Sequence, residues 1–181
     1  MDDGALAVLW RKTGVVWWFI SGGLVVDCGR GGEFQLGNGE ANILDDVCPK
    51  TINPQLCFHV LKNDPYVYKG DIHSLLSIAL YIAQDNTTST YNLVHSLLQQ
   101  PITDPNVKAQ LTNCLNNYKD AGDKLESCND LLRTADYRKI SLLASAALND
   151  SRACDQAQLK QLSQTVQEFS NLVFVIAYDL K

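Results

Sequence analysis

The sequence predicts an all-α protein: an antiparallel up-down-up-down four-helix bundle over residues 70–181, preceded by a helical hairpin over residues 41–64. Apolar residues recur at steps of three and four over four long segments, which is the period of an amphipathic helix. The connections between these segments are short, so successive helices are expected to run antiparallel. No segment alternates between apolar and polar residues for long, so no β-sheet is expected.

The hairpin is predicted from two short helical arms. The first arm spans residues 41–47. Asn53 is a good N-cap for the second arm, and the proline after it stands in the first helical turn, where proline is tolerated. The second arm is predicted over Gln55–Asn63. Cys48 and Cys57 are nine positions apart and would tie the two arms together.

The four bundle helices are marked by their caps and apolar stripes. The first begins at Asp71 and has a polar gap at Asn86–Thr90, the second opens at Asp104, and the third has Asp136 as N-cap. A turn at Asn149–Ser151 is predicted to end the third helix. The predicted core positions, helix by helix, are Ile72, Leu76, Ala79, Ala83, Leu93 and Leu97; Val107, Leu111, Cys114, Leu115, Tyr118, Leu125, Cys128 and Leu132; Ile140, Leu143, Ala144 and Ala147; and Leu159, Leu162, Val166, Phe169, Val173, Ile176 and Leu180.

Composition and charge restrict the class of partner. The chain has 181 residues, 46% apolar and 19% charged, which suits one folded domain with a real core, here assigned to residues 41–181. Its net charge of −5 argues against nucleic acid and against an acidic membrane surface as a partner.

Residues 1–40 are predicted to be a secretory signal peptide and a disordered leader. Two basic residues precede an apolar run over residues 14–26, which is shorter than the roughly 20 residues of a membrane span and typical of a signal peptide. Cleavage is expected between Val26 and Gly32. The alternative is an irregular upstream segment, because the acidic start and the tryptophan-rich cluster are unusual. The favoured interpretation is a secreted protein without a membrane anchor.

Four cysteines are positioned to cross-link the domain, although six cysteines allow many connectivities. Proximity favours a bond between Cys48 and Cys57. Cys114 and Cys154 could meet at one end of an antiparallel helix pair, because the chain runs along one helix and returns along the next. A loop of about 40 residues closed in this way would stabilise the fold by roughly 3–4 kcal/mol.

The remaining cysteines and the histidines do not suggest a metal site or a catalytic site. Cys28 is expected to leave with the leader, and Cys128 lies on an apolar stripe, which predicts a buried free thiol. The histidines at His59, His73 and His95 lie far apart in the sequence and belong to no nucleophile motif. No glycine loop that could cradle a phosphate occurs after the leader. Neither a cofactor nor enzymatic activity is expected.

Several stretches of the chain resemble plant pectin methylesterase inhibitors, over roughly residues 43–180. The superfamily of these inhibitors also contains the invertase inhibitors. Cysteine spacing and the residues around the cysteines carry the resemblance together. The stretches are Cys48–Cys57 (CPKTINPQLC), Asn113–Ala121 (NCLNNYKDA), Asp136-Tyr137, and Ser145–Ala147 leading to Cys154.

The resemblance implies a bundle with two disulfides, Cys48–Cys57 and Cys114–Cys154, and a partner that is a carbohydrate enzyme. Family members are not enzymes; they form one-to-one complexes in which the bundle helices cover the substrate cleft of pectin methylesterase. Invertase inhibitors typically carry a Pro-Lys-Phe tripeptide near the start of the third bundle helix, and the corresponding stretch here (DYRK) lacks it. Pectin methylesterase of the cell wall is therefore the expected partner of a monomeric inhibitor, and acid invertase is the alternative.

Five residues on the second and third bundle helices are candidates for contacting the partner. Asp120 and Asp123 could pair with basic groups around an esterase cleft, and Tyr137 could supply an amphipathic anchor. The alternative is a solvated face, with Asp136 acting only as an N-cap and Tyr137 packing inside. The candidates are Asn116, Asp120, Asp123, Asp136 and Tyr137.

Two sequons are candidate glycosylation sites in a secreted chain. Asn149 is expected in a turn and is the better acceptor, whereas Asn86 falls near the core stripe, where a glycan would clash. A further interpretation of the whole domain is a structural or ligand-carrying bundle. The bulky residues of the fourth helix predict a filled core and favour a protein that binds through its surface.

Overall fold

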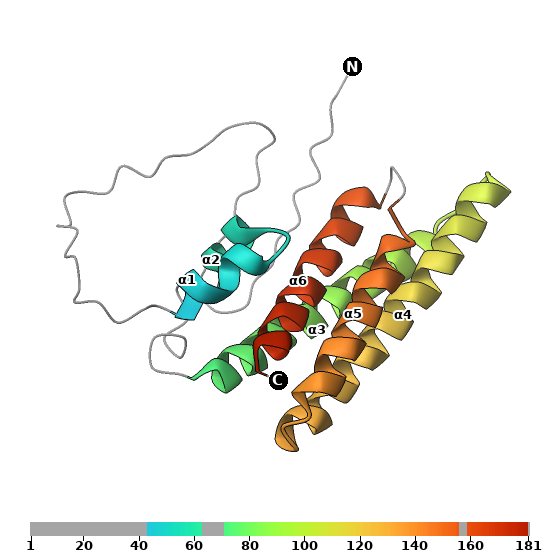
Figure 1. Ribbon diagram of the computed structural model, residues 1–181. Coiled ribbons are helices and arrows are strands. Elements are labelled where there is room, and N and C mark those ends of the chain that lie inside the picture. Colours follow the sequence, from blue (N-terminus) through green and yellow to red (C-terminus); the bar gives the residue numbers. More distant parts are fainter. Residues whose placement is uncertain (1–42, 63–70, 156–158, 181) are drawn as a thin grey trace, which may run out of the picture. The chain divides into compact units, whose positions relative to one another are not determined.

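The computed structural model describes residues 43–62, 71–155 and 159–180, and all regular structure in these ranges is helical (Figure 1). A hairpin of short helices comes first, and four long helices follow. The elements are α1 (Ile43–Val47), the 3₁₀ helix η1 (Cys48–Lys50), α2 (Pro54–Leu61), α3 (Ile72–Leu98), α4 (Pro105–Arg133), α5 (Tyr137–Arg152) and α6 (Lys160–Asp179).

The four long helices form the predicted bundle. Helix α4 packs against α3 and α5, and α6 packs against α5 and α3, so each helix has two neighbours around a shared core. Successive helices follow one another through short connections, as expected for antiparallel neighbours (Figure 1). The predicted all-helical fold class is confirmed.

Side-chain caps begin four of the helices where the sequence places them, and in three of these caps the bond spans three residues. The cap oxygen accepts a hydrogen bond from the backbone N–H three residues further on, at 3.1 Å for Asn53, 2.9 Å for Asp71 and 3.1 Å for Asp136. Asp104 caps α4 with a 2.8 Å bond to the N–H two residues on. Each cap satisfies an N–H group that the first turn of a helix leaves unpaired.

The predicted turn at Asn149–Ser151 is wrong, because α5 continues to Arg152. Ser151 is fully buried, and its Oγ donates to the carbonyl oxygen of Leu148 at 2.8 Å, a bond within the helix. Its own carbonyl accepts a hydrogen bond from Ser163 Oγ at 2.6 Å. Of the three polar residues that suggested a turn, Ser151 therefore belongs to the α5–α6 contact.

The prediction that Leu93 faces the core is also wrong, since 43% of this residue is exposed. The apolar stripe of α3 continues through the polar gap by way of Thr87 and Thr90, which are buried, and reaches Val94. Thr87 can occupy a core position because its Oγ1 donates to the carbonyl oxygen of Ala83 at 2.7 Å. Leu93 lies one residue away from this stripe and so points outward.

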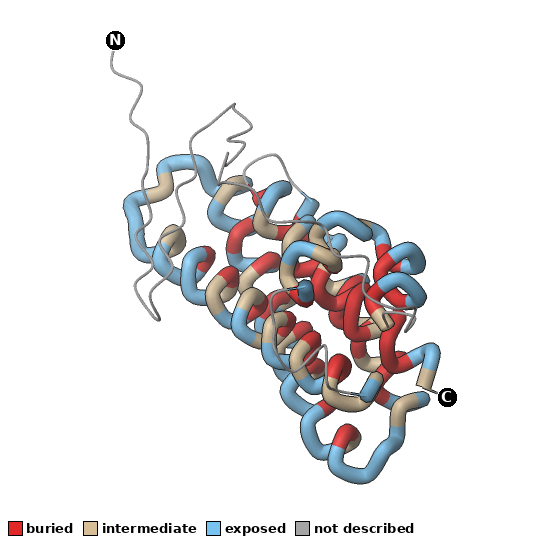
Figure 2. The backbone as a smooth tube through the Cα atoms, turned by 90° about the vertical axis from the view of Figure 1, so that its left-hand side faces the viewer, coloured by how far each residue is buried: buried red, intermediate tan, exposed pale blue. Residues whose placement is uncertain are grey.

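The core divides into two clusters, and buried residues line the inner sides of the helices (Figure 2). The hairpin cluster is mainly aliphatic and joins Leu44, Val47 and Leu61 of the hairpin to α3, α4, α5 and α6. The distal cluster fills the other part of the bundle. It contains Val94, Leu111, Cys114, Tyr118, Cys154, Leu159 and Val166.

Both expected disulfides are present. Cys48 and Cys57 have Cα atoms 5.5 Å apart, and Cys114 and Cys154 have Cα atoms 5.4 Å apart, both within the range of a disulfide. Cys128 is a buried free cysteine, as its place on the stripe predicts, and burial raises the pKa of its thiol to about 12.

The hairpin is fastened to α6 by polar contacts. Asn171 of α6 is buried, and its Oδ1 accepts from the backbone N–H of Ile52 at 2.8 Å. Asn53 Nδ2 donates to Glu168 at 2.9 Å, and the Lys50 ammonium lies 2.6 Å from an Asp179 carboxylate oxygen. Helix α6 is therefore buried on more sides than its apolar stripe alone predicts.

The predicted signal peptide, the leader and Cys28 lie outside the described residues. Of the helices that the structure does describe, none combines the length and the apolar character that a membrane crossing requires.

Candidate partner-binding surface

The three candidate residues on α4 share one exposed stripe. Asn116, Asp120 and Asp123 are all exposed, and steps of four and three residues put them on the same helical face. The sequence therefore located an accessible polar surface on the bundle.

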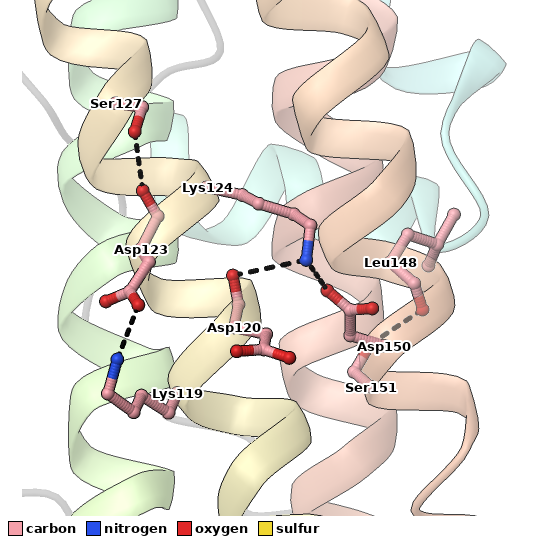
Figure 3. Close-up of polar contacts among 8 residues, drawn as sticks. All are labelled: Lys119, Asp120, Asp123, Lys124, Ser127, Leu148, Asp150 and Ser151. Atoms are coloured by element: carbon pink, nitrogen blue, oxygen red, sulfur yellow. Dashed lines mark hydrogen bonds and ion pairs between the residues drawn. The ribbon is translucent and has the colours of Figure 1, made fainter.

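Two lysines organise the charges around this stripe (Figure 3). Lys119 Nζ pairs with Asp123 Oδ2 at 2.6 Å; this hydrogen bond, together with the charges of Asp123 and Asp120, raises the pKa of the Lys119 ammonium. Lys124 Nζ lies 2.7 Å from Asp150 Oδ2 on α5 and 3.4 Å from the carbonyl oxygen of Asp120. Asp123 already has a cation, whereas the Asp120 carboxylate accepts no hydrogen bond from the described residues. Asp120 is the more available acid for an incoming basic group.

Asp136 and Tyr137 occupy a different place and have structural roles. Asp136 is exposed and caps α5. Tyr137 is half-buried against the hairpin cluster, and its ring makes a T-shaped contact with the His73 imidazole, with the centroids 6.1 Å apart. Arg133, the last residue of α4, lies ten positions after Asp123, so at about 1.5 Å per residue the turn that holds Asp136 lies roughly 15 Å or more from the α4 stripe. The candidates therefore form two groups.

A groove between α3 and α4 adjoins the stripe and was not predicted. It has a volume of about 500 Å³. Gly122 lies in its lining opposite Thr87, and a Cβ atom on this glycine would meet Thr87 Cγ2 at 3.8 Å. The only sequence signal was a glycine inside an otherwise regular helical pattern. The groove is bordered by Gln84, Thr88 and Tyr91 of α3 and by Lys119, Asp123 and Glu126 of α4.

The two sequons differ in their surroundings. Asn149 is exposed on the last turns of α5, whereas Asn86 is half-buried in α3 and its Nδ2 donates to the carbonyl oxygen of Ile82 at 3.1 Å. Within the described ranges, His, Cys, Asp and Glu residues form no group of three or more that could hold a metal ion.

The bundle, its hairpin and its two disulfides define a class of small helical proteins cross-linked by disulfides. The chain belongs to the plant invertase/pectin methylesterase inhibitor family, whose sequence profile matches residues 42–176.

The chain is similar both to proteins named as pectinesterase inhibitors and to a protein named as an inhibitor of fructosidase. It is 31% identical over 147 residues to the pectinesterase inhibitor of Actinidia deliciosa, which covers 76% of this chain and 79% of that protein. Pectinesterase inhibitor 2 of Arabidopsis thaliana is 25% identical over 119 residues, covering 66% of this chain and 68% of that one. The cell wall / vacuolar inhibitor of fructosidase 2 of Arabidopsis thaliana is 31% identical over 105 residues, with 57% and 58% covered.

Solved structures share the fold. A mutant form of a pectin methylesterase inhibitor from Arabidopsis matches with a TM-score of 0.68 at 21% identity, covering 76% of this chain and 97% of that one. A second crystal structure of a pectin methylesterase inhibitor, from Arabidopsis thaliana, matches with a TM-score of 0.58 at 22% identity, covering 79% and 99%. These matches identify the architecture as that of the inhibitor bundle.

Proposed function

We propose that this protein is a secreted, non-enzymatic inhibitor that binds pectin methylesterase one to one and occludes its substrate cleft. It would thereby modulate pectin de-esterification in the cell wall. The observation that carries the proposal is the similarity to the pectinesterase inhibitor of Actinidia deliciosa, which spans 76% of this chain and 79% of that protein.

The disulfides support a site of action outside the cytosol. Bonds such as Cys48–Cys57 and Cys114–Cys154 persist in oxidising compartments and are rare among reduced intracellular proteins. The apolar run near the N-terminus supplies a route of export, as a signal peptide.

The exposed stripe of α4 is the proposed centre of the partner contact. Asn116 offers an amide, and Asp120 offers a carboxylate that no described cation pairs with directly. Asp123 contributes less free charge because Lys119 pairs with it. Asp136 and Tyr137 are assigned to the edge of the interface, since one caps a helix and the other packs inward.

Inhibition of acid invertase is the second candidate function. The 31% identity to an inhibitor of fructosidase over 105 residues favours it. The stretch Asp136–Lys139 argues against it, because it lacks the tripeptide that invertase inhibitors typically carry at this place.

A paired titration distinguishes the two functions. The full-length, oxidised protein is added in increasing amounts to a plant pectin methylesterase and, separately, to acid invertase, from mildly acidic to neutral pH. The esterase is expected to lose activity with an end point at one inhibitor per enzyme. Loss of invertase activity alone would replace the proposal with the second candidate, and loss of neither would refute both.

Replacing the free carboxylate on α4 tests the proposed surface. Asp120→Asn is expected to weaken inhibition about two- to fivefold, the effect of losing one exposed charge contact. Asp46→Asn removes an exposed acid from the hairpin and is the matched control, which should leave the inhibition constant unchanged. An unchanged constant for Asp120→Asn, or a loss at Asp46→Asn, would move the interface away from α4.

A further inference from the structure

We propose that Asn149 carries an N-linked glycan, that Asn86 does not, and that the glycan at Asn149 partly shields the Asp120 side of α4 from the esterase. The inference rests on the proposed function, because glycan transfer requires secretion and shielding requires a contact with the enzyme. It concerns a modification of the inhibitor and a regulation of its affinity.

The surroundings of Asn149 can accommodate a large polar attachment. The residue is exposed near the end of α5, and its side-chain amide makes no hydrogen bond to any described residue. A glycan is bulky and solvent-seeking, so it needs an asparagine whose amide nitrogen opens to solvent. The sequon hydroxyl of Ser151 is buried in the fold and donates to the Leu148 carbonyl. The glycan must therefore be transferred to Asn149 before α5 packs against α6 during folding.

The surroundings of Asn86 cannot accommodate such an attachment in the same way. Its Nδ2, the atom that would carry the sugar, donates to the carbonyl oxygen of Ile82 at 3.1 Å, so it points back along α3. The next residue, Thr87, is 1% exposed and is tied to Ala83. A glycan attached at Asn86 before folding would have to open the packing of α3, so a chain modified there is not expected to fold, and the folded, secreted protein carries this asparagine unmodified.

The contacts of the Lys124 ammonium place Asn149 close to Asp120, the proposed centre of the esterase contact. The next residue, Asp150, pairs with Lys124 at 2.7 Å, and the same Lys124 ammonium lies 3.4 Å from the carbonyl oxygen of Asp120. Figure 3 shows Asp120 and Asp150 on either side of this ammonium. Asn149 therefore lies at the level of Asp120 across the seam between α4 and α5. A glycan here occupies space through which an enzyme would approach Asp120.

Mass spectrometry of the secreted full-length chain tests the site. The chain is expressed in a plant secretory host with its own N-terminus, and in parallel behind an established secretion leader. Enzymatic deglycosylation in heavy-oxygen water should label Asn149 in the tryptic peptide Ile140–Arg152 and leave Asn86 unlabelled. An unlabelled Asn149, or a labelled Asn86, would overturn the assignment. Secretion with the foreign leader alone would count against the proposed signal peptide and leave the sequon result valid.

Inhibition measurements test the shielding. Asn149→Gln made in the same host is expected to inhibit pectin methylesterase about two- to fivefold more tightly than the glycosylated protein. Asn86→Gln is the matched control and should equal the unsubstituted protein. Equal constants for Asn149→Gln and the glycosylated protein would overturn the shielding. If none of the three proteins inhibits the esterase, the proposed function and the shielding both fail, while the glycan assignment stands.

Discussion

The hairpin cluster and the distal cluster fill the two parts of one bundle by different means. At the hairpin cluster, aliphatic side chains of α1 and α2 pack onto the long helices, and a disulfide closes only the hairpin itself. At the distal cluster no further element packs on the bundle within the described residues, and the Cys114–Cys154 bond ties α4 to the end of α5. The hairpin cluster thus depends on packing, and the distal cluster depends on oxidation.

The distal cluster also has buried polar groups beside it, on α5 and α6. In the distal part Ser163 Oγ donates to the Ser151 carbonyl at 2.6 Å, and Gln167 Nε2 donates to Ser163 Oγ at 2.9 Å. Tyr118 is fully buried nearby; burial and the Asp155 charge raise the pKa of its phenol, and the Ser163 hydroxyl opposes this shift. The Ser163 and Gln167 hydrogen bonds specify the α5–α6 contact because each of these buried groups needs its partner.

Removing the two disulfides separately is the strongest test of the comparison. Cys114→Ala with Cys154→Ala should lower the free energy of unfolding by about 4 kcal/mol, and Cys48→Ala with Cys57→Ala by about 2.5 kcal/mol. The reason is loop length, since the bonds join residues 40 and 9 positions apart. Urea unfolding of the oxidised variants measures both values. A larger loss for the hairpin pair would contradict the comparison.

The contact between the hairpin and α6 predicts the next largest effect. Asn171→Ala leaves the backbone N–H of Ile52 without its acceptor in a partly buried place and removes a buried amide from α6, which should cost about 1–3 kcal/mol. Lys50→Ala removes only a partly exposed ion pair with Asp179 and should cost less than about 1 kcal/mol. Thermal unfolding of both variants gives the ranking, and a reversed ranking would show that charge rather than the buried amide holds the hairpin.

Cys128 predicts a pH dependence in the hairpin cluster. Burial raises the pKa of its thiol from 9.0 to about 12, so above pH 9 the folded protein retains a proton that the unfolded chain loses. The contribution of Cys128 to the free energy of unfolding is therefore fully present below pH 9 and is lost between pH 9 and about 12. At pH 10 the free energy of unfolding should be about 1.4 kcal/mol lower than below pH 9. Urea unfolding at pH 8 and pH 10 should show a smaller decline for Cys128→Ala. An equal decline would indicate that other groups govern it.

The turn between α4 and α5 predicts the smallest effect, in the opposite direction. Ala135 has a φ of 55°, a left-handed conformation that costs a residue with a Cβ more than it costs glycine. Ala135→Gly should raise the free energy of unfolding by about 0.5–1 kcal/mol. Destabilisation in the same urea assay would mean that the Cβ atom of Ala135 contributes packing that outweighs its backbone strain.

Local signals made the helices predictable, and tertiary contacts account for the errors. Asn53 and Asp136 mark helix starts in the sequence because an N-cap side chain accepts a hydrogen bond from a backbone N–H in the first turn of the helix that it begins. Leu93 was wrongly placed in the core because the true buried stripe of α3 runs through Thr87, a polar residue that the sequence pattern did not count as core. Thr87 can be buried because its hydroxyl bonds within its own helix. Asn171 was missed because its partner lies in the hairpin, 119 positions away in the sequence.

The candidate surface was predictable only in part for the same reason. The spacing of Asn116, Asp120 and Asp123 gives their common face directly. It does not reveal that Lys119 pairs with Asp123 or that α3 forms a groove beside them, because both depend on side-chain placement. The role of Tyr137 likewise depends on His73, which belongs to another helix.

Carboxylate footprinting of the inhibitor, alone and with an equal amount of pectin methylesterase, tests most directly whether the bundle rather than the hairpin binds the enzyme. Asp120 on α4 and Asp46 on α1 are both exposed and should react alike in the free protein. In the complex, labelling of Asp120 should fall strongly while labelling of Asp46 stays unchanged. Protection of Asp46 with Asp120 still fully reactive would contradict the account.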